Sequence, residues 1–257
     1  NVEASSSSSS STAATLHGAL EECPVCLESI VYPVRIRCQH AFCNSCVRRW
    51  VYDTEFEHRC PLCRTPWPEI QQIIIAEGFL MTGDVEAALH GIDEVLKSHC
   101  MLSVAYFVLG RIFRSAGRLE SALLAYQQAA RLDATDADVH SNLGIVLRSL
   151  GRLDEAILAY NQAVHIDPNC SSTHYNLGNA LSSAGRNTEA ADSLRRATVL
   201  NPTDHSAFCN LGAVLVGVGD HKGALTAYCK AMEIDPTDST TMFNLGQLLR
   251  AFGLEDE

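Results

Sequence analysis

The chain has 257 residues, of which 47% are hydrophobic and 19% charged, and its formal net charge is -11. This composition is that of a folded globular chain, and no apolar run approaches the roughly 18 residues of a membrane span. Residues 69–257 carry 13 basic and 23 acidic side chains. They therefore lack the clustered positive charge that a phosphate backbone requires, and we expect neither nucleic acid nor a membrane as a partner.

The N-terminal segment, residues 1–19, contains an unbroken serine run from Ser5 to Ser11. Small polar side chains bury too little surface to offset the entropy of ordering the chain. We therefore predict a disordered tail over residues 1–19.

Cysteine is concentrated in the next segment. Seven of the 11 cysteines lie between residues 23 and 63, and the chain shows no charged-then-apolar signal layout at its start. This clustering favours a metal site in a reducing compartment over disulfides. We expect the protein in the cytoplasm, with the nucleus as the alternative.

Eight residues of this segment have the spacing of zinc ligands, as three Cys-x-x-Cys pairs and one Cys-x-His pair. They are Cys23, Cys26, Cys38, His40, Cys43, Cys46, Cys60 and Cys63. Zinc takes four sulfur or nitrogen ligands in a tetrahedron, so eight ligands fill two closed sites and leave no position for a catalytic water. Spacing alone also permits two successive fingers.

The order of these ligands resembles that of a RING finger, with Gln39 as a mild departure where that family usually has glycine. In that family the ligand pairs alternate between two ions. The resemblance implies one zinc on Cys23, Cys26, Cys43 and Cys46, and a second on Cys38, His40, Cys60 and Cys63. His58 is a competing candidate that we expect to be an exposed histidine. We therefore predict a small zinc-bound RING of the α+β type over residues 20–68, with two Zn²⁺ ions.

The resemblance also implies an activity. Ligase-active RING fingers dock a ubiquitin-conjugating enzyme through positions that match Val25, Trp50 and Pro61 here, and they tend to carry a cation at the position of Arg64. Such a finger supplies no nucleophile and acts by positioning the ubiquitin thioester. A guanidinium has five fixed donors, so Arg64 suits contact with ubiquitin and the conjugating enzyme together. A core tryptophan and an ordinary surface arginine are the alternatives.

Residues 69–257 repeat with a period of 34. Glycines recur at positions 110, 144, 178, 212 and 246 and again at 117, 151, 185, 219 and 253, and prolines stand at 168, 202 and 236. Apolar spacings of three and four predict two helices in each row, ended by glycine and then by proline. This pattern resembles the tetratricopeptide repeat. We predict an all-α solenoid with a degenerate row at 69–102, full rows at 103–136, 137–170, 171–204 and 205–238, and a partial row at 239–257.

Stacked repeats of this kind form a concave groove lined by their first helices. In one column that faces the groove in this family, asparagine recurs as Asn142, Asn176, Asn210 and Asn244. An amide offers a donor and an acceptor to a peptide backbone, and the column resembles the asparagine ladder of O-GlcNAc transferases. We expect the groove to hold a peptide or a protein substrate. Asparagines that are merely solvated are the alternative.

Two further groove columns argue against one class of partner. Chaperone-binding repeat proteins use lysines there to clamp a C-terminal carboxylate. The matching columns of this chain hold Val104, Asp138 and Ser172, and Phe107, Ser141 and Tyr175. None is lysine, so an adaptor for chaperone tails is disfavoured.

Taken together, the sequence predicts a RING-type ubiquitin ligase whose partners are a ubiquitin-conjugating enzyme, ubiquitin and a substrate held by the repeats. A non-catalytic scaffold that joins a zinc module to a repeat array is the first alternative. A fragment of a longer enzyme is the second, because the chain begins at Asn1 and its last row holds one helix.

Overall fold

The computed structural model describes residues 22–26, 34–35, 41–52, 59–62, 64, 66–98 and 102–251, without the side chains of Arg35, Trp50 and Tyr52. The predicted tail at residues 1–19 lies outside these ranges. None of the described helices is both long and apolar enough to cross a bilayer.

The cysteine-rich segment forms a small α+β unit, as predicted. Strand β1 (Val34–Arg35) pairs antiparallel with β2 (Ala41–Phe42), so that Val34 lies opposite Phe42. Helix α1 (Asn44–Tyr52) follows directly. Its Val47 and Val51 are buried with Val34 and Phe42. This core is too small to hold the segment together without additional cross-links or metal ions.

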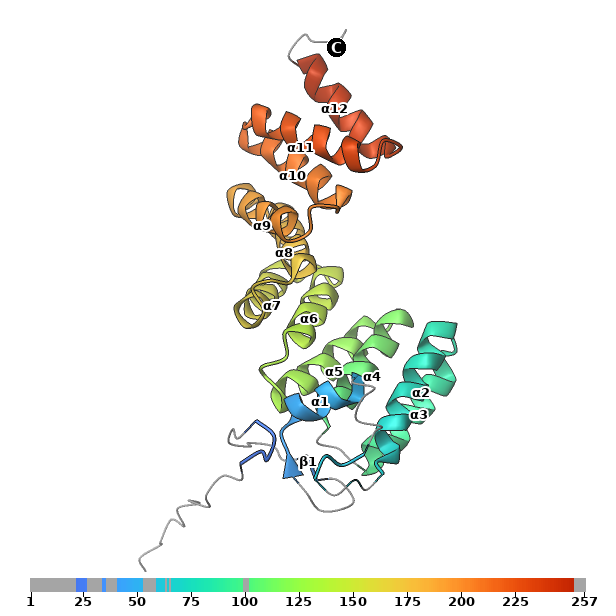
Figure 1. Ribbon diagram of the computed structural model, residues 1–257. Helices are drawn as coiled ribbons and strands as arrows, with labels where there is room; N and C mark the ends of the chain where they lie inside the picture. The colour runs from blue at the N-terminus through green and yellow to red at the C-terminus, as the bar shows by residue number, and fades with distance from the viewer. Residues whose placement is uncertain are drawn as a thin grey trace, which may run out of the picture.

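The rest of the described chain is helical, in agreement with the predicted solenoid (Figure 1). The helices are α2 (Pro68–Thr82), α3 (Val85–Ser98), α4 (Ser103–Ser115), α5 (Leu119–Leu132), α6 (Ala137–Ser149), α7 (Leu153–Ile166), α8 (Ser171–Ser183), α9 (Asn187–Leu200), α10 (His205–Val218), α11 (His221–Ile234) and α12 (Ser239–Ala251). The two helices of each row pack on each other, and each pair packs on the next. The core is therefore continuous along the array.

The recurring residues explain this packing. A Cβ placed on Gly144 would lie 2.7 Å from the ring of Tyr160 in the following helix, and that ring is fully buried. Glycine thus lets α6 and α7 approach closely. Gly151 ends the first helix with a φ of 76°, a conformation in which a Cβ is unfavourable. Pro168 follows two residues after α7 ends.

The array ends on a half repeat. Helix α12 packs on α10 and α11, and no second helix covers it within the described residues. Met242 and Phe243 of α12 are 46% and 64% exposed. The predicted partial row is therefore a single helix in the part of the chain described here.

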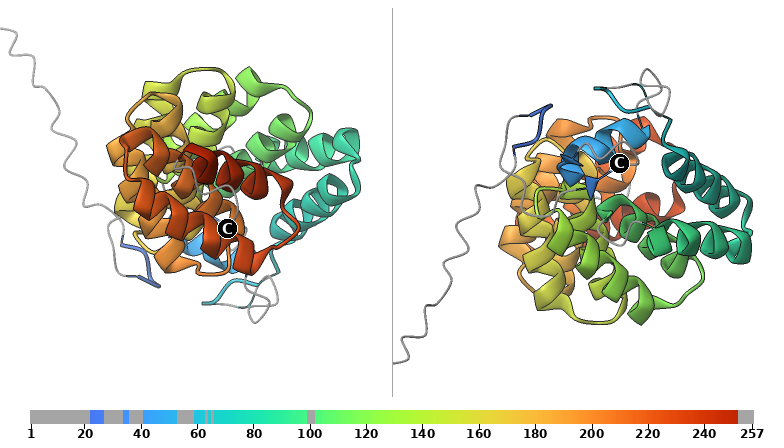
Figure 2. Two further views of the ribbon diagram at one scale, coloured as in Figure 1. Left: turned by 90° about the horizontal axis from the view of Figure 1, so that it is seen from above. Right: turned by 90° about the horizontal axis from the view of Figure 1, so that it is seen from below.

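Helix α1 of the cysteine-rich unit lies against the repeats. It contacts α2 and α4, and in the views along the array it lies on the side toward which the arc of α2 to α7 opens (Figure 2). The junction is short, because Trp67 is buried and α2 begins at the next residue, Pro68. The two parts of the chain are thus joined by packing as well as by sequence.

Candidate metal centre and docking surface

Four of the predicted zinc ligands come together. Cys23 and Cys26 lie on a turn, and Cys43 and Cys46 lie at the start of α1. Their sulfur atoms all lie within 4.8 Å of one another, and those of Cys26 and Cys43 are 3.6 Å apart. Tetrahedral zinc with Zn–S bonds of about 2.3 Å places its sulfurs about 3.8 Å apart. The cluster therefore fits one zinc ion, and it is the alternating set of pairs that a RING finger requires.

The electrostatics of the cluster also suit a cation. Burial raises the pKa of Cys43 to about 11 and raises that of Cys46 further. Burial acts in the same direction on Cys23, but backbone N–H groups, first that of Cys43, outweigh it and lower the pKa of Cys23 to about 7. Without an ion, neighbouring thiolates repel one another, so one negative charge is favoured and others are opposed. A divalent cation held by these four cysteines would offset much of this repulsion and favour the thiolate form of all four.

The second ligand set is described only at Cys60, whose side chain is fully buried. Cys38, His40 and Cys63 lie outside the described residues, as does the competing candidate His58. The pairing of these residues on a second zinc ion stays a prediction.

The predicted docking residues flank the buried ligands. Val25, two residues after the buried Cys23, is 47% exposed. Pro61 is partly exposed beside the buried Cys60, and Leu62, which the sequence analysis did not single out, is 50% exposed. The backbone of Trp50 lies in α1, while its side chain lies outside the description. The sequence did contain a signal for the exposure of Leu62, because it stands between the ligands Cys60 and Cys63. A short loop between two ligands leaves little room to bury a large side chain.

Arg64 has an unusual backbone. It is exposed, and among the described residues it is the one non-glycine with a positive φ, 61°. Its N–H donates to the Cys60 carbonyl at 2.8 Å, and the Arg59 guanidinium donates to the Arg64 carbonyl at 3.4 Å. A left-handed residue with a Cβ costs about 1–2 kcal/mol, and such residues cluster at functional sites. The turn therefore holds an exposed cation next to the zinc loop in a strained backbone conformation.

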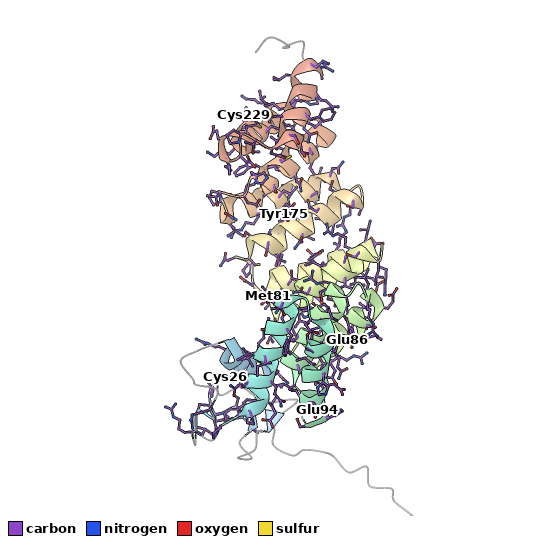
Figure 3. The ribbon with its side chains drawn as sticks, turned by 90° about the vertical axis from the view of Figure 1, so that its right-hand side faces the viewer. Cys26, Met81, Glu86, Glu94, Tyr175 and Cys229 are labelled. Carbon is purple, nitrogen blue, oxygen red and sulfur yellow. The ribbon has the colours of Figure 1, made fainter. Side chains whose placement is uncertain are left out.

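The asparagine column lies on the first helices, half-buried at each position. Asn142 donates to the Asp138 carbonyl of its own helix at 2.9 Å. Asn210 donates to the Tyr175 hydroxyl at 3.1 Å and to Asn179 Oδ1 at 2.9 Å. These last bonds link α10 to α8, and Figure 3 shows Tyr175 midway along the array. The column therefore also ties neighbouring repeats together, a role that the sequence analysis missed.

Family models match the cysteine-rich segment and the helical repeats separately. Residues 23–63 match the zinc finger of C3HC4-type, RING. Residues 75–137, 107–169 and 205–238 match models of the tetratricopeptide repeat, and residues 178–219 match the TPR repeat. The chain is therefore a C3HC4-type RING zinc finger followed by tetratricopeptide repeats, and its four-cysteine cluster is a zinc-binding site.

Relatives match through the RING region. The E3 ubiquitin-protein ligase rnf146 of Danio rerio is 48% identical over 48 residues, which is 19% of this chain and 12% of that protein. The helicase-like transcription factor of Mus musculus is 40% identical over 47 residues, 18% of this chain and 5% of that protein. The human E3 ubiquitin-protein ligase SH3RF2 is 48% identical over 48 residues, 18% and 6% respectively. The match thus spans only a small part of each relative.

Solved structures match through the repeats. The crystal structure of MamA superposes with a TM-score of 0.56 at 28% identity, over 58% of this chain and 86% of that one. YrrB, described as a TPR protein with an unusual peptide-binding site, superposes with a TM-score of 0.59 at 23% identity, over 67% and 89%. At this sequence identity, the similarity to YrrB shows a shared fold alone.

Proposed function

We propose that the protein is a RING-type ubiquitin ligase whose repeats hold the substrate. The observation that carries the proposal is the exposure of Val25 and Leu62 beside fully buried zinc-ligand cysteines. Large apolar side chains that stay exposed beside buried ligands are candidates for a protein-binding surface. The similarity of this region to ubiquitin ligases supports a ubiquitin-conjugating enzyme as the partner, and we propose Trp50 and Pro61 as further docking residues.

The chemistry on this chain is positioning. Two zinc ions, the first on the clustered cysteines and the second on Cys38, His40, Cys60 and Cys63, fix the loops that carry Val25 and Leu62. Arg64 donates hydrogen bonds to ubiquitin and to the conjugating enzyme and restricts the thioester to a reactive pose. Its left-handed backbone and its exposure support this role, because strained residues of this kind cluster at functional sites.

The repeats supply the second half of the function. Helices α8 and α10 contain no Asp, Glu, Lys or Arg, although the whole chain has a net charge of -11. This stretch of the groove, over α8 and α10, selects against charged segments because it cannot compensate their desolvation. We therefore assign it an extended, uncharged segment of the substrate, bound through asparagine amides that include Asn176 and Asn244. The ligase acts in the cytoplasm or nucleus.

Discharge of ubiquitin tests the proposal. The full chain is mixed with a ubiquitin-charged conjugating enzyme, drawn from a panel, and free lysine as the acceptor. We expect discharge well above the rate without the chain, and a decrease of about tenfold for Arg64→Ala. Arg131→Ala, an exposed arginine on α5, is the matched control and should keep the full rate.

Zinc content and helicity are measured on the same samples, so that a misfolded variant is recognised. An Arg64→Ala variant that is folded and fully active removes Arg64 from the mechanism. A zinc-loaded chain that is inactive with the whole panel of conjugating enzymes overturns the ligase and leaves the non-catalytic scaffold.

A further inference from the structure

Zinc ligands bracket the residue that joins the finger to the repeats. Asn44 lies between Cys43 and Cys46 at the start of α1, and its side chain is 4% exposed. Its Oδ1 accepts the backbone N–H of Ser103 at 2.8 Å. Its Nδ2 donates to the Leu132 carbonyl at 3.3 Å. One amide thus satisfies the first N–H of α4 and the last carbonyl of α5, groups that a helix leaves without an internal partner.

The first full repeat depends on this amide because it lacks a cap of its own. The residue before α4 is Leu102, whose side chain cannot accept a hydrogen bond. The corresponding residues before α6 and α10 are Asp136 and Asp204, and each caps its helix with a carboxylate. Ser103 is buried, so water cannot replace the missing cap there. The RING finger provides it from another domain.

One turn further along α1, Arg48 reaches the repeats. Its guanidinium lies over the Phe107 ring at 4.3 Å. It forms ion pairs with Asp136 and, at 2.8 Å, with Asp138. The side chains of Arg48 and Asp136 are 14% and 6% exposed, so their attraction is only weakly screened by solvent.

Two of these partners, Phe107 and Asp138, lie on the first helices that line the concave groove. Helix α1 itself packs on the first helices α2 and α4, and Phe107 is buried where α1 covers it. Charge is complementary as well, because α1 contains two arginines and no acid. It contacts the acidic segment 133–138, where Ser45 also donates to Asp133 at 3.0 Å. Helix α1 therefore lies where a peptide ligand of the first repeats would bind.

We propose that α1 is a built-in occupant of the N-terminal part of the groove, and that Asn44 and Arg48 are positioning residues. They hold the conjugating-enzyme surface in one orientation relative to the open part of the groove over α8, α10 and α12. A substrate is confined to that open part, and its lysines meet the ubiquitin thioester from a fixed direction. The orientation effect rests on the ligase activity proposed above, whereas the occupied groove does not.

Hydrogen exchange tests the occupied groove without any activity. In the zinc-loaded chain we expect slow exchange of the Ser103 amide. Asn44→Ala should accelerate it at least tenfold and leave the Val139 amide, which Asp136 caps, unchanged. Asn176→Ala on α8 is the matched control and should alter neither amide. Equal protection of Ser103 in the wild type and in a zinc-loaded Asn44→Ala variant overturns the proposal.

The chain's own lysines test the orientation. There are three, Lys97 on α3 and Lys222 and Lys230 on α11. Self-ubiquitination at low protein concentration is mapped by mass spectrometry, and discharge to free lysine is measured in parallel. Arg48→Ala should keep the discharge rate but change the ratio of modification between α3 and α11 at least threefold. Arg49→Ala, exposed on the same helix, should change neither.

The Arg48→Lys variant tests whether Arg48 orients the RING finger or only stabilises the fold. Lysine keeps the ion pairs but loses the planar stack on Phe107, so we expect a lysine pattern between those of the wild type and Arg48→Ala. An identical pattern in all four proteins shows that the RING orientation is not set by Arg48. Absence of all discharge points instead to failure of the ligase proposal, while exchange at Ser103 still reports on the groove.

Discussion

The RING finger and the repeats reach order by opposite routes. In its described residues the finger has two short strands, one helix and a handful of buried apolar residues, and four of its cysteines lie close enough to share one zinc ion. The repeats use the same glycine, alanine and tyrosine contacts many times over. Order in the finger is therefore all-or-none with the ion, whereas order in the array is a sum over neighbouring units.

The two regions are not independent where α1 meets the repeats, at the contacts of Asn44 and Arg48 that we call the joint. Helix α1 belongs to the finger by its ligands Cys43 and Cys46, yet its side chains complete the first full repeat. A unit whose order depends on zinc thus contributes to one whose order comes from packing. Loss of order in the finger should therefore destabilise the first full repeat, and this destabilisation should decrease along the array.

Zinc removal should have the largest effect. A strong chelator should release the ion from the cluster of Cys23, Cys26, Cys43 and Cys46 and abolish ubiquitin discharge completely. Helical content should change little, since α1 supplies only nine helical residues. Thermal unfolding followed by circular dichroism should nevertheless begin at a lower temperature, because α4 loses its cap. A chelated chain with an unaltered melting curve would show that the finger and the repeats are independent.

The second effect tests packing within the array alone. Gly144→Ala brings a methyl group to 2.7 Å from the Tyr160 ring, which is fully buried, and overpacking of this kind costs about 1–3 kcal/mol. Gly246 occupies the same column on α12, but a Cβ there meets nothing within 4 Å. Gly246→Ala should therefore stabilise the chain by up to about 1 kcal/mol through helix propensity.

Urea denaturation of the two glycine variants measures the contrast, with zinc content as a check that the finger is intact in both. We expect the unfolding midpoint to decrease for Gly144→Ala and to stay or increase for Gly246→Ala. Equal losses at both positions would mean that the column is glycine for a reason other than the approach of the second helix.

Much of the fold followed from the sequence because its determinants are local and repeated. The positive φ of Gly117 and Gly151 and the end of α7 before Pro168 are properties of single residues. The four-cysteine cluster followed from ligand order and the resemblance to RING fingers. The exact limits of the domains and the roles of the docking residues remain predictions.

The joint escaped sequence analysis because it pairs residues about 60 to 90 positions apart, from two families that fold separately elsewhere. Two signals were present. The segment 133–138 carries three aspartates, and it has Ala134 in the column where the next three rows have proline. Leu102 also stands where Asp136 and Asp204 cap their helices, although Cys170 before α8 provides no side-chain cap either. Neither signal indicates Asn44 as the partner.

The smallest expected effect is the difference in stability between substitutions at Asp136, which also pairs with Arg48, and at Asp204, which only caps a helix. Asp136 caps α6 and also pairs with Arg48, whereas Asp204 caps α10. Asparagine caps a helix about as well as aspartate, so Asp204→Asn should change the free energy of unfolding by no more than about 0.5 kcal/mol. Asp136→Asn keeps the cap but removes the buried charge opposite Arg48, at a cost of about 1–2 kcal/mol.

A high salt concentration tests whether the stability difference between the two variants comes from a buried ion pair. The Arg48–Asp136 pair is largely buried, so its contribution should persist at 1 M salt, where charges on the surface are screened. We therefore expect the stability difference between Asp136→Asn and Asp204→Asn to remain when urea denaturation is repeated in 1 M sodium chloride. A difference that vanishes in salt would place the pair in solvent and reduce the joint to the Asn44 cap and the Phe107 stack.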